Sequence, residues 1–196
     1  MRGKLALLVS IFLLVLAGVF LIPSGPWAGK AHEETVIFLV RHAERADDGP
    51  GDPQVAMDRQ MAQDPPLSEA GRLRSSLLAE LVRDAGITRI HSTDYRRTRE
   101  TADPTSDATG VEVAIYDPSD LDAFAEDLRS SPGRHLVVGH SNTTPELVAA
   151  LGGDPGLPME SLEYDRLYVV TLEETGASTI LLRFGEPFVG SGRPGP

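Results

Sequence analysis

The chain has 196 residues, the length of one domain, and its apolar share of 41% and charged share of 24% are typical of a globular protein. Its net charge of −11 argues against a nucleic-acid binder, which would normally present a basic face. There is no cysteine, so disulfide bonds, thiolate nucleophiles and cysteine metal sites are excluded together.

The N-terminal segment has the pattern of an export signal. Arg2 and Lys4 precede an apolar run over residues 5–22, which is long enough to span a bilayer. The basic end should stay in the cytoplasm. We therefore expect residues 1–31 to be a membrane anchor or a cleaved signal peptide. Either outcome places the following domain, residues 32–185, outside the cytoplasmic membrane, as an anchored, periplasmic or secreted protein.

A buried strand, a long loop and a helix are the next predicted elements. Residues 35–40 form a continuous run rich in β-branched side chains, typical of a central strand buried on both faces. Residues 47–66 are rich in Asp, Pro, Gly and Gln, which predicts a long loop with a functional role. Ser68 then has the position of a helix N-cap, apolar residues recur at helical spacing as far as Ala85, and Gly86 follows as the stop.

The rest of the chain continues this alternation. Thr144 and Pro145 predict the N-cap and first residue of a late helix, and residues 186–196 predict a flexible Pro/Gly tail. The pattern predicts an α/β fold, a three-layer sandwich with a mainly parallel central sheet flanked by helices, whose site lies at the carboxyl ends of the strands. Strands are expected at 89–92, 111–115, 135–138, 166–172 and 178–184, and helices at 95–108, 119–130 and 144–151.

Three predicted strand ends carry residues suited to phosphate chemistry. The first ends in Arg41-His42-Ala43-Glu44, the second runs into an arginine-rich segment at 92–102, and the fourth ends in Gly139-His140-Ser141-Asn142. Phosphate is close to a dianion and needs the fixed charge of arginine. A neutral imidazole can attack phosphorus, and a second imidazole can donate hydrogen bonds to its oxygens. Such a site needs neither a metal nor a cofactor.

The same segments resemble the motifs of the histidine phosphatase superfamily, also called the phosphoglycerate mutase-like family. Ala43 stands where the Arg-His-Gly-Glu signature usually has glycine, and Arg97 aligns with the arginine of the second motif. The resemblance covers about residues 34–184 with the motifs in the expected order, and it is strongest to the small bacterial branch that includes phosphohistidine phosphatases. The matching segments are 40–44, 67–71, 92–102 and 136–142.

The resemblance implies a role for each matching residue. It implies that His42 is the phosphorylated nucleophile, that Arg41, Arg97 and His140 bind the phosphate, and that Glu44 belongs to the catalytic set. Asn142 is expected either to bond the phosphate or to cap the following loop.

The proton donor is left open by the resemblance, because Ser141 stands where some relatives have an aspartate. Candidate donors are Glu44, Asp117, Asp120 and the acids of the 47–66 loop. By contrast, His91 is expected to be structural, His135 to face solvent, and Arg96 and Arg99 to form surface pairs.

These observations favour a metal-independent phosphatase that hydrolyses a phosphorylated small molecule or phosphoprotein through a phosphohistidine on His42. One alternative is a phosphoglycerate mutase-like phosphotransferase, which needs a pocket that excludes water. Another is a non-catalytic envelope protein that binds a phosphorylated ligand on the same fold. A zinc hydrolase is disfavoured, since no His-Glu-x-x-His or similar spacing occurs.

Overall fold

The computed structural model describes residues 34–48 and 63–190. The predicted export signal or anchor at residues 1–31, and residues 49–62 of the predicted long loop, lie outside these ranges. No helix within the ranges described is long and apolar enough to cross a membrane.

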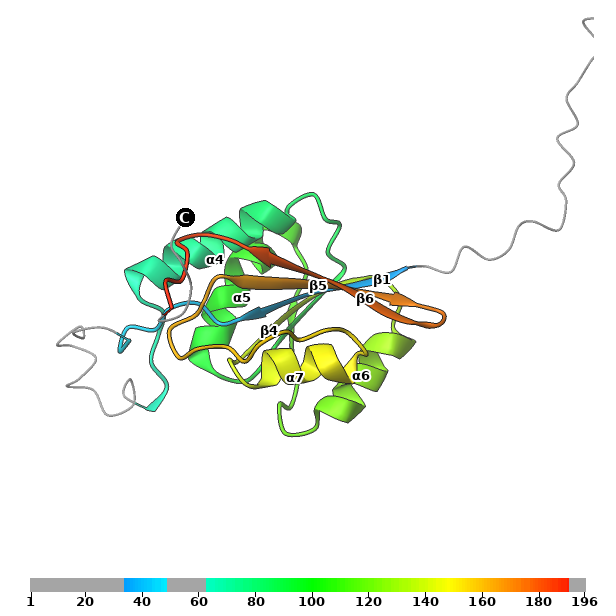
Figure 1. The fold of residues 1–196 in the computed structure, drawn as a ribbon. Coiled ribbons are helices and arrows are strands. Elements are labelled where there is room, and N and C mark those ends of the chain that lie inside the picture. Colours follow the sequence, from blue (N-terminus) through cyan, green and yellow to red (C-terminus); the bar gives the residue numbers. More distant parts are fainter. Residues whose placement is uncertain (1–33, 49–62, 191–196) are drawn as a thin grey trace, which may run out of the picture. The chain divides into compact units, whose positions relative to one another are not determined.

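One mixed six-stranded sheet runs through the described residues, in the order β3-β2-β4-β1-β5-β6 (Figure 1). Its parallel part comprises β1 to β4, whereas β5 runs antiparallel to β1, and β6 antiparallel to β5. The α/β fold with a mainly parallel sheet is therefore confirmed. The strands are β1 (Thr35–Arg41), β2 (Arg89–Ser92), β3 (Val113–Ile115), β4 (Arg134–Gly139), β5 (Arg166–Glu173) and β6 (Gly176–Arg183).

Helices cover both faces of this sheet (Figure 1). The pair α4 and α5 packs on one face, and the pair α6 and α7 on the other. Strand β1 supplies Ile37 and Leu39 to the core beneath α6 and α7, and Val40 to the core beneath α4. This two-sided burial explains its continuous apolar sequence. The helices are α4 (Glu69–Val82), α5 (Arg96–Thr109), α6 (Leu121–Ser130) and α7 (Thr143–Ala150).

The two predicted helix caps have different outcomes. The Ser68 hydroxyl accepts the Gly71 N–H at 3.0 Å, which confirms Ser68 as the N-cap of α4. The prediction for Thr144 is wrong, because α7 begins at Thr143, two residues before the predicted first residue Pro145, and has Asn142 at its N-cap. The Thr144 hydroxyl instead donates to the Val40 carbonyl at 3.3 Å, so it ties α7 to the end of β1.

His135 is fully buried, which makes the prediction that it faces solvent wrong. Its Nε2 atom lies 2.8 Å from the Ser131 carbonyl, and its Nδ1 atom lies 3.1 Å from Nε2 of His91. Because a carbonyl oxygen only accepts, Nε2 of His135 carries the proton and His91 donates to Nδ1. The two stacked rings link β2 to β4, a structural role for His91.

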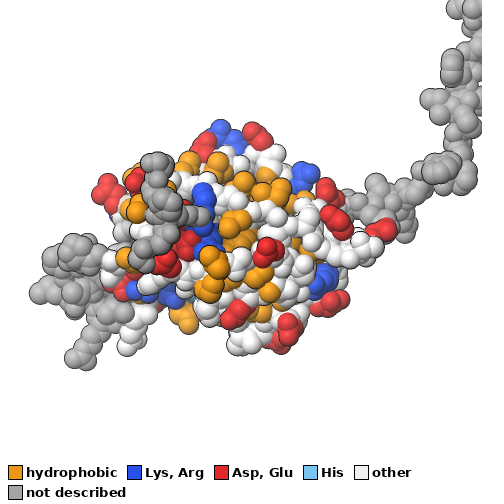
Figure 2. All heavy atoms as spheres, in the orientation of Figure 1, with side chains coloured by type: hydrophobic (Ala, Val, Ile, Leu, Met, Phe, Trp, Pro, Cys, Tyr) orange, Lys and Arg blue, Asp and Glu red, His pale blue; other side chains and the backbone are white. Residues whose placement is uncertain are grey.

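Helix α4 leaves part of its apolar sequence exposed. It buries Leu78 and Val82, whereas Leu73 is 67% exposed. Figure 2 shows hydrophobic side chains gathered over α4 and the neighbouring edge strand β6. The exposed large apolar residues of these two elements are Leu73, Leu77, Leu81, Ile180, Leu181 and Leu182.

The first residues of the predicted flexible tail contact the domain. The Phe188 N–H donates to the Asp165 carboxylate at 3.2 Å, and the Glu186 carbonyl accepts from Arg74 at 3.0 Å. The boundary at residue 185 stays a prediction.

Candidate active site

A cavity of about 450 Å³ lies where β1, β2 and β4 end. It lies at the carboxyl ends of parallel strands, as expected for an open α/β sheet. Within the described part of the chain, no three His, Asp or Glu side chains are grouped to hold a metal ion. The predicted site residues that line the cavity are Arg41, His42, Arg97, His140 and Asn142.

His42 is a buried, neutral imidazole at the end of β1. Its backbone N–H bonds to the Gly139 carbonyl at 2.9 Å, which joins it to the end of β4. Its Nδ1 atom lies 2.8 Å from the Ala43 carbonyl, so Nδ1 carries the proton and Nε2 keeps a lone pair. Burial lowers the pKa of His42 to about 2, and the nearby Arg41 and Arg97 act in the same direction, against the Ala43 hydrogen bond. The ring is therefore available as a nucleophile at neutral pH.

His140 is held by a chain of hydroxyl groups. Its Nε2 atom lies 2.9 Å from the Thr93 hydroxyl, which lies 2.9 Å from the Thr98 hydroxyl. Thr98 donates to the carbonyls of Thr93 and Tyr95, so the Thr93 hydroxyl must donate to Thr98 and accept from His140. This places the His140 proton on Nε2 and leaves Nδ1 toward Arg97, whose Nη2 atom is 3.5 Å away.

The electrostatics of His140 resemble those of His42. Burial lowers the pKa of His140 to about 4, with further lowering by Arg97 and Arg41. The two rings lie edge to face with their centroids 5.5 Å apart. Two neutral imidazoles thus face one cavity that also contains arginine charges, an arrangement in which a bound anion would raise the pKa of His140.

Arg41 and Arg97 each have an unsatisfied donor. The Nε atoms of both side chains are buried and have no hydrogen-bond partner among the described residues. Arg41 packs over the Tyr164 ring at 4.0 Å, and Arg97 packs over the Tyr95 ring at 4.3 Å. Since an unpaired buried donor is costly, both groups suit a cavity that receives an oxyanion.

Three residues at the site were missed by the sequence analysis: Arg45, Tyr95 and Tyr164. Arg45 lines the cavity, and its Nε atom lies 2.9 Å from an Asp47 carboxylate oxygen. Its signal was an arginine three residues after His42, directly after the first matching segment. Tyr95 lies inside the matching segment at 92–102, two residues before Arg97, and that position was its signal. Tyr164 had no comparable signal, because only the fold brings it to Arg41.

Glu44 is not brought together with the other predicted residues. Its carboxylate is bound by Arg74 of α4, with Nε at 2.9 Å and Nη2 at 2.8 Å from Oε1. The same guanidinium donates to the Phe184 carbonyl at 2.5 Å. Glu44 thus turns from the strand end toward α4 and the C-terminal segment, and it does not line the cavity.

The other candidate proton donors occupy different places. Asp117 accepts from the Ser119 backbone at 2.9 Å, and Asp120 caps α6 by accepting from Ala123 at 3.2 Å. Both line a separate hollow beside His91. Asp64, from the 47–66 loop, instead lies 3.5 Å from Nη1 of Arg97, within the phosphate-binding set implied by the sequence.

Comparisons with known proteins agree with the resemblance that the sequence motifs indicate. The family model of the histidine phosphatase superfamily (branch 1) matches residues 37–118. The "Probable phosphoglycerate mutase GpmB" of Yersinia enterocolitica is 37% identical over 82 residues, which are 42% of this chain and 35% of that protein. The chain thus spans about a third of the length of the curated relatives it matches.

Solved structures share the fold over most of the chain. The protein histidine phosphatase SixA, complexed with tungstate, superposes with a TM-score of 0.58 at 19% identity, covering 76% of this chain and 96% of that one. The ecdysone phosphate phosphatase of Bombix mori, also with tungstate, gives 0.55 at 16% identity, covering 82% and 97%. These likenesses extend past residue 118, where the family match ends.

Proposed function

Since the chain belongs to branch 1 of the histidine phosphatase superfamily, we propose that it is a metal-independent phosphatase that passes a phosphoryl group from its substrate to His42 and then to water. One observation carries the proposal. The cavity combines a neutral His42, whose Nε2 lone pair is not engaged by any described residue, with the buried Nε–H groups of Arg41 and Arg97, which have no partner among the same residues. Transfer of a phosphoryl group needs a nucleophile that attacks phosphorus and hydrogen-bond donors that bind its oxygens.

In the first step, Nε2 of His42 forms a bond to phosphorus as the bond from phosphorus to the leaving oxygen breaks. The His42 ring becomes cationic, and its Nδ1–H stays hydrogen-bonded to the Ala43 carbonyl. Arg41 and Arg97 stabilise the equatorial oxygens, and His140 donates to them once the bound anion has raised its pKa. The leaving oxygen takes a proton from an acid.

In the second step, water attacks phosphorus and the bond from phosphorus to Nε2 breaks. Inorganic phosphate leaves and His42 returns to its neutral form. We assign the acid that protonates the leaving oxygen, and later takes a proton from water, to Asp64. It is the described acid of the 47–66 loop whose carboxylate contacts Arg97.

The substrate class is a phosphorylated small molecule or a phosphoprotein. The tungstate complexes of the two structural neighbours support this class, because tungstate is a tetrahedral oxyanion like phosphate. Arg45 adds a third arginine to the cavity wall and would meet a further oxygen of the phosphate or of the leaving group.

We further propose that this phosphatase works outside the cytoplasmic membrane. The basic Arg2 and Lys4 and the apolar run at 5–22 support export. Residues 1–31 fused to a reporter that is active only outside the cytoplasm should give activity. We expect the reporter activity to be lost when leucines of the apolar run are replaced by arginine. An inactive wild-type fusion would reject the placement of the domain outside the cytoplasmic membrane.

The enzymatic proposal is tested with the full-length chain in mild detergent, an aryl phosphate and an excess of chelator. We expect activity that resists the chelator and vanishes in His42→Ala. His91→Ala is the matched control, because that histidine lies outside the cavity. Radiolabelled substrate should label the wild type through an acid-labile, alkali-stable bond. Activity that survives in His42→Ala would reject the mechanism.

A further inference from the structure

Arg41 is held from behind by one short segment, residues 160–164. Its Nη1 atom donates to the carbonyl oxygens of Glu160 and Glu163 at 3.2 Å and 3.0 Å. Its Nη2 atom lies 3.3 Å from the hydroxyl of Tyr164, and its guanidinium lies over the Tyr164 ring. These contacts set the plane of the guanidinium, and with it the direction of the unpaired Nε–H.

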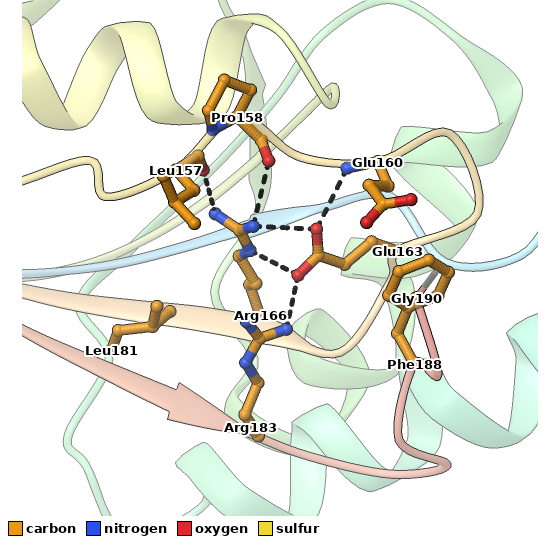
Figure 3. Close-up of a pocket in the computed structure, with 9 residues that line it drawn as sticks. All are labelled: Leu157, Pro158, Glu160, Glu163, Arg166, Leu181, Arg183, Phe188 and Gly190. Carbon is orange, nitrogen blue, oxygen red and sulfur yellow. Dashed lines mark hydrogen bonds and ion pairs between the residues drawn. The ribbon is translucent and has the colours of Figure 1, made fainter. Parts of the chain in front are cut away.

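The side chain of Glu163 holds this segment through a hydrogen bond to its own backbone. Glu163 is 3% exposed, and its carboxylate accepts the backbone N–H of Glu160 at 3.0 Å. It also bridges Arg166, at 2.7 Å and 2.8 Å, and Arg183, at 2.6 Å (Figure 3). Burial alone would raise the pKa of Glu163, but hydrogen bonds from Arg166, Glu160 and Arg183 outweigh it and hold the pKa at about 2. The group is therefore an anion at every working pH.

We propose that Glu163 is a positioning residue for the phosphate site: its carboxylate fixes the 160–163 turn so that the two carbonyls orient Arg41. The carboxylate holds the N–H of Glu160, while the C=O of Glu160 holds Arg41. The two ends of the turn are thus set by one buried group. The effect on phosphate binding rests on the function proposed above, whereas the effect on Arg41 itself does not.

A neighbouring carboxylate separates positioning from simple stabilisation. Asp165 is 1% exposed and belongs to the same ionic network, since it lies 2.5 Å from Nη1 of Arg183. Its other carboxylate oxygen accepts from the Phe188 N–H, so its contacts run to β6 and the C-terminal segment. Asp165→Asn should therefore weaken the same network without touching the turn that holds Arg41.

The experiment compares Glu163→Gln with Asp165→Asn in the full-length chain. Nitrogen NMR of arginine side chains reports whether rotation of the guanidinium is hindered, and Arg41→Lys assigns the Arg41 signals. We expect hindered rotation in the wild type and in Asp165→Asn, and fast rotation in Glu163→Gln. Hindered rotation in Glu163→Gln would overturn the proposal, whether or not the protein hydrolyses phosphate.

Tungstate binding, measured by calorimetry, tests whether the position of Arg41 affects the binding of an oxyanion. We expect Glu163→Gln to weaken tungstate binding ~10-fold and Asp165→Asn to leave it unchanged. In an Arg41→Ala background, Glu163→Gln should not weaken tungstate binding further, because the effects of two coupled residues on affinity do not add. An additive loss would show that Glu163 does not act through Arg41. A wild type that binds no tungstate would reject the proposed function instead, and the NMR result would still decide the role of Glu163.

Discussion

The Nδ1 atom of His42 lies 2.8 Å from the carbonyl oxygen of Ala43, the next residue in the chain. A backbone carbonyl cannot donate, so this contact fixes the tautomer of the ring without any second side chain. His140 differs, because its tautomer is set by the hydroxyl groups of Thr93 and Thr98. The tautomer of His42, the proposed nucleophile, thus depends on backbone geometry, whereas that of His140 depends on side chains that a single substitution can remove.

The neutrality of the buried histidines makes the stability of the fold depend on pH. The pKa is about 2 for His42 and about 4 for His91 and His140, against an ordinary value near 6.5. In the unfolded chain they take up protons as the pH falls below about 6.5, while the folded chain resists this. The free energy of unfolding should therefore fall between pH 6.5 and 4, by at most about 1.4 kcal/mol per pH unit for each histidine.

Urea denaturation at pH 7, 6 and 5 measures this slope. His42→Asn serves as the control, because it should remove about one proton from the uptake on unfolding. A slope that is the same in the variant and in the wild type would contradict the neutral state of His42.

Thr93→Val is expected to impair catalysis while leaving the fold intact. Valine keeps the shape of this fully buried residue but removes the hydroxyl that accepts from His140 and donates to Thr98. The His140 ring is then free to rotate, and we expect kcat/KM for an aryl phosphate to fall by about 10- to 100-fold. Steady-state kinetics beside a thermal melt separates this effect from unfolding, and an unchanged kcat/KM would show that His140 needs no such support.

Asp64 and Glu44 should respond differently to the leaving group of the substrate. If Asp64 protonates the leaving oxygen, Asp64→Asn should lower kcat about 100-fold for an alkyl phosphate and far less for a nitrophenyl phosphate. Glu44→Gln should lower stability by about 1–3 kcal/mol, because it leaves Arg74 poorly paired, with the same effect on both substrates. Leaving-group dependence in Glu44→Gln but not in Asp64→Asn would reverse the assignment.

Gly71 is predicted to accept no side chain. A Cβ atom added there would lie 2.2 Å from the Glu44 carbonyl oxygen, which also accepts the Ser68 N–H at 2.9 Å. Gly71→Ala should force the segment after His42 away from α4, at a cost of about 1–3 kcal/mol, and lower activity with it. Ala70→Gly, on the exposed side of the same helix turn, is the control. Equal melting temperatures for Gly71→Ala and the wild type would show that the segment yields without strain.

The fold was predictable because its signals are local. The buried run at 35–40 and the cap at Ser68 depend on neighbouring residues in sequence, and the structure reproduces both. Thr144 was misplaced because Asn142 and Thr143 offered an earlier start, and because the hydroxyl of Thr144 found a tertiary partner in Val40. His135 was misjudged because nothing in the sequence shows that His91 and the Ser131 carbonyl satisfy both of its ring nitrogens.

Residues of the site were predictable where the position of the backbone alone brings them together. They were unpredictable where membership depends on the direction in which a side chain points. Arg41, His42 and His140 lie at the ends of adjacent parallel strands, so topology alone brings them together. Glu44 lies only two residues after His42, yet its carboxylate turns to Arg74, which α4 supplies from 30 residues away. Tyr164 lies more than 120 residues from Arg41, and only the antiparallel return of the chain into β5 brings it beneath the guanidinium.

The placement of β1 between β4 and β5 has a consequence for how the molecule opens. Its inner residues pair with β4 on one side and with β5 on the other, and its side chains reach both cores. Amide protons in such a strand exchange with solvent through global rather than local opening. His42, the proposed nucleophile, is therefore attached to the last segment to come apart. Partial unfolding at the sheet edges, where β3 and β6 each have a single neighbour, would leave His42 in its native surroundings.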